Sequence, residues 1–295
     1  MENITFYIVD VFAEEKFAGN QLAVFPDAKS IPSEMMQKIA REMNFSETTF
    51  ILSEGVSDTY NVRIFTPNEE IPFAGHPVLG TAYVLQKTLI SEEIRRLTLN
   101  LKAGPVTVLF KHIEDEPDII WMRQREADFG KTFKGEELAG LLGLDLSDLD
   151  TRFPIEEVST GLPMILVPLK GLDPLKKAKI DADKYFSLIR ESRAKAVYIF
   201  SPQAYTGSGD LSARMFAPYY GIEEDPATGS AAGCLAGYLL KHRYFGTDKI
   251  CLSIEQGYEV SRPSKLYIKG EYERGKMIIY VGGKVQMVGK GELVI

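Results

Sequence analysis

The chain has 295 residues, 45% of them hydrophobic and 25% charged, with a net charge of −7. This length favours two domains, and the composition is that of a soluble globular protein with a full core. The acidic charge argues against nucleic-acid binding, and the absence of a long apolar run, of a basic leader and of a CxxC pair argues for a cytoplasmic protein without membrane spans or disulfides.

The first part of the chain predicts strands with two intervening helices. Apolar residues at helical spacing predict a helix over 32–42, and a second helix is expected to follow an irregular start within 67–87. Strand-like runs, including a hairpin that turns at Ala103-Gly104, are expected at 4–12, 19–25, 46–53, 60–66 and 97–111.

The acidic segment 113–118 is the predicted domain boundary. It divides the chain into one half-domain of residues 1–115 plus 283–295 and another of residues 116–282. After it, helices are expected over 135–149 (with a short continuation), 181–192 and 229–243, among strands at 119–124, 164–169, 196–201, 212–218 and throughout 250–295. Single helices scattered among many strands favour the α+β class over a regular parallel sheet.

An internal repeat relates the two halves. "RIFTP" (63–67) and "RMFAP" (214–218) share R-x-F-x-P, and each leads through an acidic loop to a small residue, a glycine, a polar residue and an apolar helix. These helix starts read "AGHP" (74–77) and "TGSA" (228–231). Both helices are apolar nearly all round, which is typical of a buried helix. The repeat predicts two similar half-domains, each a curved, mostly antiparallel sheet around a central helix.

The first turns of these helices are the candidate binding sites. A helix N-terminus offers unpaired N–H groups and a positive dipole end, and glycine lets a ligand approach the backbone. Two such starts, at Gly75-His76 and Gly229-Ser230, facing a cleft between the halves, would bind a small carboxylate-bearing molecule. The alternative is ordinary helix capping by His76, Thr228 or Ser230.

Two carboxylates are candidate acid/base groups. Asp225 lies three residues before Thr228, and Glu47 shares a strand face with Thr49 and Ile51. An apolar environment would raise the pKa of Glu47 toward a range useful for proton transfer, whereas a solvent-facing strand glutamate is the structural alternative. Glu223 and Glu224 are interpreted as plain loop acids.

The histidines and cysteines predict no metal site or disulfide. His76, His112 and His242 are not spaced as metal ligands. Cys234 and Cys251 are expected to be core residues.

Five motifs occur in order along the chain: "DVFAEEKFAGNQLAVF", "NFSETTFIL", "RIFTPNEEIPFAGHPVLGTA", "GLPMILVPL" and "RMFAPYYGIEEDPATGSAAG". Together they resemble the PhzF (phenazine biosynthesis-like) family. The family is similar in fold to diaminopimelate epimerase, with two similar halves and the active site between them.

The resemblance assigns roles to individual residues. It implies that Glu47 moves a proton within the substrate without a cofactor, and that His76, Asp225 and Ser230 bind and polarise the substrate. The resemblance also implies a homodimer. The residues expected to contribute further to binding, in part through backbone donors, are Gly75, Asn20, Thr228 and Gly229.

One departure from the epimerase relatives matters for mechanism. Those enzymes place a cysteine directly before the glycine of each half-site, where this chain has Ala74 and Thr228. A two-cysteine racemase mechanism is therefore excluded. The expected function is a cofactor-independent isomerase acting on a small carboxylate-bearing metabolite, a cyclic or amino/hydroxy acid. The alternatives are a metabolite-binding or interaction protein without turnover and a metal-dependent hydrolase that uses His76 and Asp225.

Overall fold

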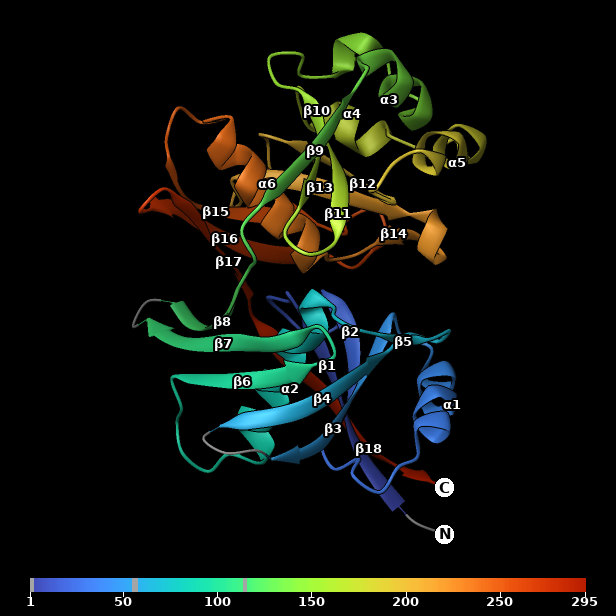
Figure 1. Ribbon diagram of the computed structural model, residues 1–295, viewed down its shortest axis with the longest axis vertical. Helices are drawn as coiled ribbons and strands as arrows, with labels where there is room; N and C mark the ends of the chain where they lie inside the picture. Colours follow the sequence, from blue (N-terminus) through green and yellow to red (C-terminus); the bar gives the residue numbers. More distant parts are fainter. Residues whose placement is uncertain (1–2, 55–57, 114–115) are drawn as a thin grey trace. The chain divides into compact units, whose positions relative to one another are not determined.

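The computed structural model describes residues 3–54, 58–113 and 116–295 (Figure 1). Contacts divide the chain into unit 1, Met1–Arg123 with Gly282–Ile295, and unit 2, Gln124–Val281. The first division lies after Arg123 rather than after residue 115, because the strand that follows the acidic segment pairs within unit 1. Residues 114 and 115 of that segment lie outside the described residues.

Unit 1 is a curved sheet whose strands follow the order β18–β1–β2–β3–β4–β6–β7–β8, with the short β5 beside β4. Two neighbouring pairs are parallel: β2–β3, joined through α1, and β4–β6, joined through β5 and α2. The bounds are β1 Asn3–Val11, β2 Asn20–Phe25, α1 Ser33–Met43, β3 Glu47–Glu54, β4 Thr59–Phe65, β5 Glu70–Ile71, α2 Gly75–Thr88, β6 Arg96–Leu101, β7 Gly104–Ile113, β8 Glu116–Arg123 and β18 Val285–Val294.

Unit 2 repeats this order as β9–β10–β11–β12–β13–β15–β16–β17, with the short β14 beside β13. Its parallel pairs are β11–β12, joined through α4 and α5, and β13–β15, joined through β14 and α6. The bounds are β9 Asp128–Phe133, α3 Gly135–Leu142, a 3-10 turn Leu146–Asp148, β10 Ile155–Ser159, β11 Pro163–Pro168, α4 Leu172–Lys177, α5 Ala182–Arg190, β12 Ala196–Ser201, β13 Leu211–Ala217, a 3-10 turn Pro218–Tyr220, β14 Ile222–Asp225, α6 Gly229–Lys241, β15 Lys249–Gln256, β16 Ser264–Glu273 and β17 Lys276–Gly283.

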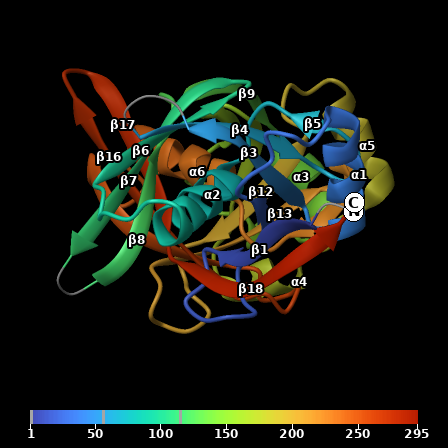
Figure 2. The ribbon, with the colours of Figure 1, turned by 90° about the horizontal axis from the view of Figure 1, so that it is seen from below.

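Both central helices are buried as their composition predicts. In unit 1, α2 contacts β1, β2, β3, β6, β7, β8 and β18 (Figure 2). Every residue of α2 from Gly75 to Ala82 is buried. In unit 2, α6 contacts β10, β11, β15 and β16, and its residues from Ala231 to Leu240 are buried. A helix without a polar face is stable only where the sheet covers it on all sides.

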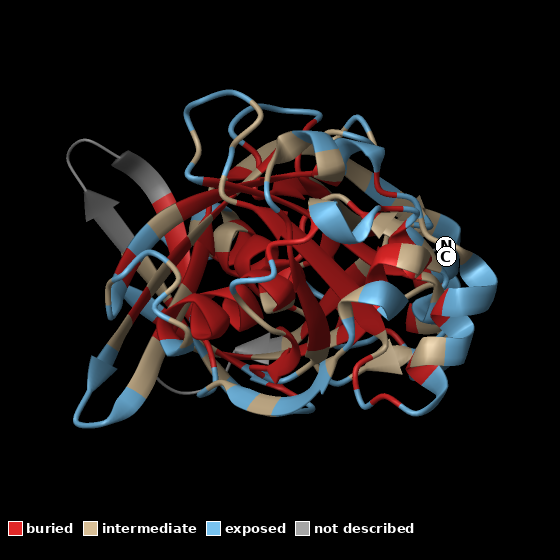
Figure 3. Ribbon diagram, turned by 90° about the horizontal axis from the view of Figure 1, so that it is seen from above, coloured by how far each residue is buried: buried red, intermediate tan, exposed pale blue. Residues whose placement is uncertain are grey.

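A second apolar layer covers the outer face of each sheet. In unit 1, α1 packs on Phe25, Phe50 and Phe65. In unit 2, α3, α4 and α5 pack on the outer face of β10–β13. The outer helices keep exposed faces (pale blue in Figure 3), whereas the interior strands and central helices are buried (red). The strands beneath these outer helices are therefore apolar on both faces.

The structure corrects several local expectations. The helix expected over 135–149 ends as α3 at Leu142, because Gly143 adopts the left-handed conformation (φ 64°) that terminates helices. Sequence patterns missed β9, β10, α4 and β14. Cys234 is buried as expected, but Cys251 is exposed, because it lies with Lys249 on the solvent face of β15.

Alanine substitution is expected to have opposite effects on stability at two helical glycines, because one is tightly packed in a central helix and the other is not. A Cβ at Gly80 in α2 would lie 2.6 Å from Leu22 Cδ2 and 2.9 Å from Val11 Cγ2, whereas a Cβ at Gly140 in α3 would meet no atom closer than 3.9 Å. Gly80→Ala should lower the free energy of unfolding by about 1–3 kcal/mol through overpacking. Gly140→Ala should raise it by about 0.5–1 kcal/mol, since alanine favours helix. Urea unfolding of both variants measures this, and a stabilised Gly80→Ala would contradict it.

Candidate active site

The half-site of unit 1 forms where β3 faces the start of α2. The buried hydroxyls of Thr49 on β3 and Thr81 on α2 hydrogen-bond at 2.9 Å, so this face of β3 points toward the central helix. Glu47 shares that face, two residues before Thr49 on β3. The strand therefore presents its carboxylate to the helix start rather than to open solvent.

Glu47 and His76 meet at this point. Glu47 Oε2 lies 3.4 Å from His76 Nε2, and the side chains are 13% and 6% exposed. The contact is slightly longer than a normal N–H···O hydrogen bond. Residues that are 29 positions apart in the sequence are thus brought into direct contact by the β3–α2 packing.

Burial lowers the pKa of His76 to about 3, and a hydrogen bond with the Gln21 backbone opposes this shift only in part. Desolvation penalises the charged imidazolium more than it penalises the neutral ring. The ring is therefore neutral at neutral pH, and its contact with Glu47 is not an imidazolium–carboxylate ion pair.

The half-site of unit 2 contains Asp225 and Thr228 at the start of α6. Both residues are buried, and the Thr228 hydroxyl donates a hydrogen bond to Asp225 Oδ2. Gln256 Nε2 donates to the Asp225 backbone carbonyl (2.8 Å) and to Thr228 Oγ1 (3.2 Å). Tyr198 donates to Gln256 Oε1 at 3.2 Å. The network fixes the loop that enters α6.

Asp225 also influences Tyr198. Burial raises the pKa of the Tyr198 hydroxyl, and the charge of Asp225 raises it further. Tyr198 therefore stays protonated and serves as a hydrogen-bond donor. Sequence patterns gave no signal for Tyr198 or Gln256 as partners of this network.

Ordinary capping does not account for the polar residues at the helix starts. The N-cap residues are Ala74 for α2 and Thr228 for α6, and neither forms a side-chain cap hydrogen bond among the described residues. The Thr228 hydroxyl turns to Asp225 instead. Of the other predicted binding residues, Gly75, Gly229 and Asn20 are buried and Ser230 is partly exposed.

The repeat extends further than the sequence motifs first indicated. "EIPFAGH" (70–76) and "EDPATGS" (224–230) align without a gap as E-x-P-x-x-G. Glu70 and Glu224 each form a bidentate ion pair with the arginine of R-x-F-x-P, Arg63 and Arg214. Glu224 is therefore not the plain loop acid expected from sequence, because its partner lies on a neighbouring strand.

Positions that differ between the two copies carry the polar candidates. Arg63 faces Phe50 across β3–β4, and Arg214 faces Ile199 across β12–β13. Glu47 lies three residues before Phe50, and Ala196 lies three residues before Ile199. Ala196 is therefore the counterpart of Glu47. Along the aligned loops, Ile71 corresponds to Asp225, Ala74 to Thr228 and His76 to Ser230. Glu47 therefore has no carboxylate counterpart in unit 2, and Asp225 has none in unit 1.

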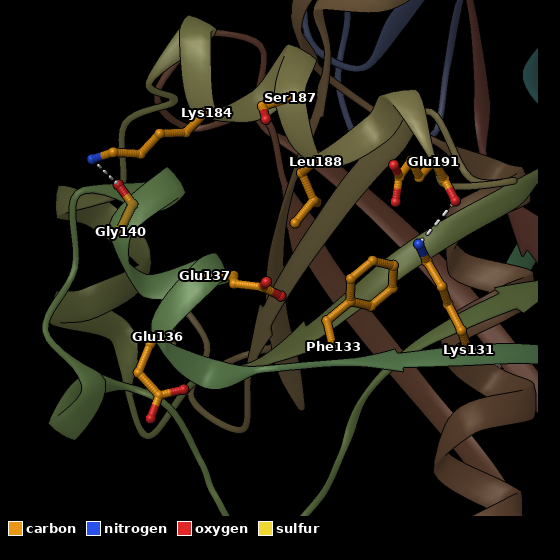
Figure 4. Close-up of a pocket in the computed structure, with 9 residues that line it drawn as sticks. All are labelled: Lys131, Phe133, Glu136, Glu137, Gly140, Lys184, Ser187, Leu188 and Glu191. Carbon is orange, nitrogen blue, oxygen red and sulfur yellow. Dashed lines mark hydrogen bonds between the residues drawn. The ribbon is translucent and has the colours of Figure 1, made fainter.

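A pocket of about 490 Å³ lies elsewhere, on the outer surface of unit 2 between α3 and α5 (Figure 4). Phe133, Glu137, Lys184 and Leu188 are among its lining residues, and it contains none of the predicted site residues.

Within the described residues, no three His, Cys, Asp or Glu side chains are grouped to hold a metal ion. Across residues 3–54, 58–113 and 116–295, no helix is long and apolar enough to cross a membrane.

Comparison with known proteins identifies the family. The family model described as phenazine biosynthesis-like protein matches residues 9–291. The chain belongs to the PhzF family. A solved structure of a PhzF-family protein from Bacillus anthracis superposes with a TM-score of 0.92 at 31% identity, and each chain is covered completely.

Curated PhzF relatives are named as isomerases. The chain is 35% identical to trans-2,3-dihydro-3-hydroxyanthranilate isomerase of Pseudomonas aeruginosa, over 90% of both chains. It is 36% identical to an uncharacterized isomerase of Pasteurella multocida, over 98% of this chain and 94% of the relative. At the level of the family, these names support an isomerase.

The fold extends beyond the PhzF family. A hydroxyproline epimerase from Agrobacterium vitis matches with a TM-score of 0.64 at 10% identity, over 99% of this chain and 91% of that one. The α+β class expected from the sequence patterns and the diaminopimelate epimerase-like fold implied by the resemblance are thus confirmed.

Proposed function

We propose that the protein is a cofactor-independent isomerase that moves a proton on a small carboxylate-bearing metabolite, with Glu47 as the acid/base. The observation that carries the proposal is the 3.4 Å contact between Glu47 Oε2 and the Nε2 atom of a neutral, buried His76. A proton-transfer group must be positioned close to its reaction partner and shielded from bulk water. The Glu47 side chain is 13% exposed, which supports the second condition, and in the proposal the substrate binds beside it.

The state of His76 supports this role. The hydrogen bond between the His76 ring and the Gln21 backbone favours the protonated ring, which is the effect of a ring N–H that donates to a carbonyl. In the neutral ring, the other nitrogen carries no proton. A carboxylate oxygen and an unprotonated ring nitrogen repel each other at this distance unless a proton lies between them. In the proposal, the pair holds one transferable proton beside the substrate.

Unit 2 supplies substrate recognition in the proposal. The start of α6 combines backbone N–H groups without a side-chain cap with the rigid Asp225–Thr228–Gln256 network. Backbone donors at a helix start favour a carboxylate. In the proposal, Ser230, Gly229 and Thr228 bind the substrate and Asp225 polarises it. Thr228→Val should then weaken binding of the substrate that Glu47 turns over.

The test is an isomerisation assay in D₂O. Candidate carboxylic acids, beginning with trans-2,3-dihydro-3-hydroxyanthranilate because a relative is named for it, are incubated with the wild-type protein and followed by NMR and mass spectrometry. We expect an isomer with the elemental formula of the substrate, in which deuterium from the solvent has replaced a hydrogen. Binding of these acids without isomerisation or exchange would favour the alternative of a metabolite-binding protein.

A further inference from the structure

The two R-x-F-x-P arginines use their donors in the same way. Arg63 Nε and Nη2 donate to the two oxygens of Glu70 at 2.9 and 2.8 Å, and Arg214 Nε and Nη2 donate to those of Glu224 at 2.9 and 2.7 Å. Each guanidinium also lies over the phenylalanine two residues later, Phe65 at 5.0 Å and Phe216 at 4.9 Å. The motif therefore encodes one interaction twice.

The remaining nitrogen, Nη1, contacts the crossover helix in both units. Arg63 Nη1 donates to the Ser33 hydroxyl at 2.6 Å, at the first residue of α1. Arg214 Nη1 donates to the carbonyls of Leu175 and Ala178, both at 2.9 Å, at the end of α4. Each arginine thus joins three segments: its own strand, the crossover helix and the loop that enters the central helix.

The joined loop ends at the polar site residues. Glu70 precedes His76 by six positions, and Glu224 precedes Ser230 by six and Asp225 by one. Between each glutamate and the helix lies a proline at the same position, Pro72 or Pro226, which restricts the backbone. Fixing the glutamate therefore fixes a short, stiff segment whose other end is the first turn of α2 or α6.

The identity of the two copies favours a role in positioning over a role in chemistry. The arginine, glutamate, proline and glycine are the same in both units, whereas the polar site residues differ. Arg63 holds the pKa of the Glu70 carboxyl below its usual range, so that the pair stays charged at neutral pH. A lysine could keep this charge but could not supply the planar three-way fork of donors.

We propose that Arg63 and Arg214 are positioning residues. Each arginine fixes the position of the polar residues at the start of its central helix relative to the residues of the neighbouring strands that they contact. The inference rests on the proposed function, because the reaction gives the positioning its purpose. For Arg63, the positioned contact is that of His76 with Glu47. Misplacing a catalytic group by about 1 Å can lower a rate by roughly 100-fold.

The test compares Arg63→Lys with Arg152→Lys. Arg152 forms the same bidentate fork with Asp150, at 2.8 and 2.8 Å. Its other contacts among the described residues are with Phe153 and Tyr244, which do not lie in a loop that enters α2 or α6. Arg63 is preferred to Arg214 because its side chain is 24% exposed rather than 7%, so its replacement disturbs the core less. We expect Arg63→Lys to lower kcat by about 10- to 100-fold with KM changed less than about threefold, and Arg152→Lys to leave both unchanged.

A second measurement does not depend on turnover. The ring of His76 is followed by NMR in both variants, and its pKa should move from about 3 toward the ordinary value in Arg63→Lys only, because a loosened helix start admits water. An unchanged His76 titration and an unchanged kcat in a folded Arg63→Lys protein would overturn the inference. If the wild type has no isomerase activity, the proposed function fails while the His76 titration still tests the positioning.

Discussion

Glu47→Gln should lower kcat by about 10²- to 10⁴-fold while leaving the fold intact, because general acid–base catalysis contributes about that factor. Glutamine has nearly the same shape as glutamate but cannot carry the transferred proton. The substitution therefore keeps the packing against His76 and removes only the acid/base chemistry. Steady-state kinetics and deuterium incorporation from D₂O measure the effect, and circular dichroism checks the fold.

Two further variants make this result specific. Glu47→Asp keeps a carboxylate but withdraws it by one methylene, so we expect activity between those of the wild type and Glu47→Gln. Glu42→Gln replaces an exposed carboxylate on α1 that is not one of the site residues, and it should leave kcat unchanged. Proton exchange that continues at the wild-type rate in Glu47→Gln would show that another group transfers the proton.

His76 should make the stability of the protein depend on pH between about 6.5 and 3. Its pKa is about 3 in the folded protein and 6.5 as a free side chain, so in this range the unfolded chain binds a proton that the native ring does not. The stabilising contribution is complete above pH 6.5 and is lost as the pH falls toward 3. The slope is at most about 1.4 kcal/mol per pH unit.

The pH effect is isolated by comparison with His76→Asn, which does not titrate. The difference in unfolding free energy between the two proteins should shrink by up to about 1.4 kcal/mol per pH unit as the pH falls below 6.5. Urea unfolding at several pH values measures this difference. A ring signal of His76 that titrates near pH 6.5 in the folded wild type would contradict the prediction, and would indicate that Glu47 stabilises a charged ring.

The sequence predicts the fold well because its signals are local. Alternating apolar residues mark most strands, and the apolar composition of α2 and α6 predicts that a sheet surrounds them. The missed segments have weak local signals: β14 is only four residues long, and β9 is mostly exposed. Strand pairing and the parallel crossovers depend on contacts between distant segments, which patterns of single elements do not contain.

The candidate site is only partly predictable for the same reason. The sequence singles out Glu47, His76, Asp225 and Thr228 one by one, from helix starts, strand faces and a family resemblance. The homodimer and the cytoplasmic location remain predictions. Partners that no motif marks, Gln256 and Tyr198, reach the loop before α6 from strands on either side of it along the chain.

The sequence by itself determined the fold class, the internal repeat and the identity of the polar candidates, because composition and spacing express which residues are buried and which segments recur. Only the tertiary structure decided that Glu47 lies against a neutral His76, and that Glu70 and Glu224 pair with the repeated arginines. These contacts join residues on different strands and helices. Their geometry follows from strand register and helix packing, which the chain acquires only when it folds.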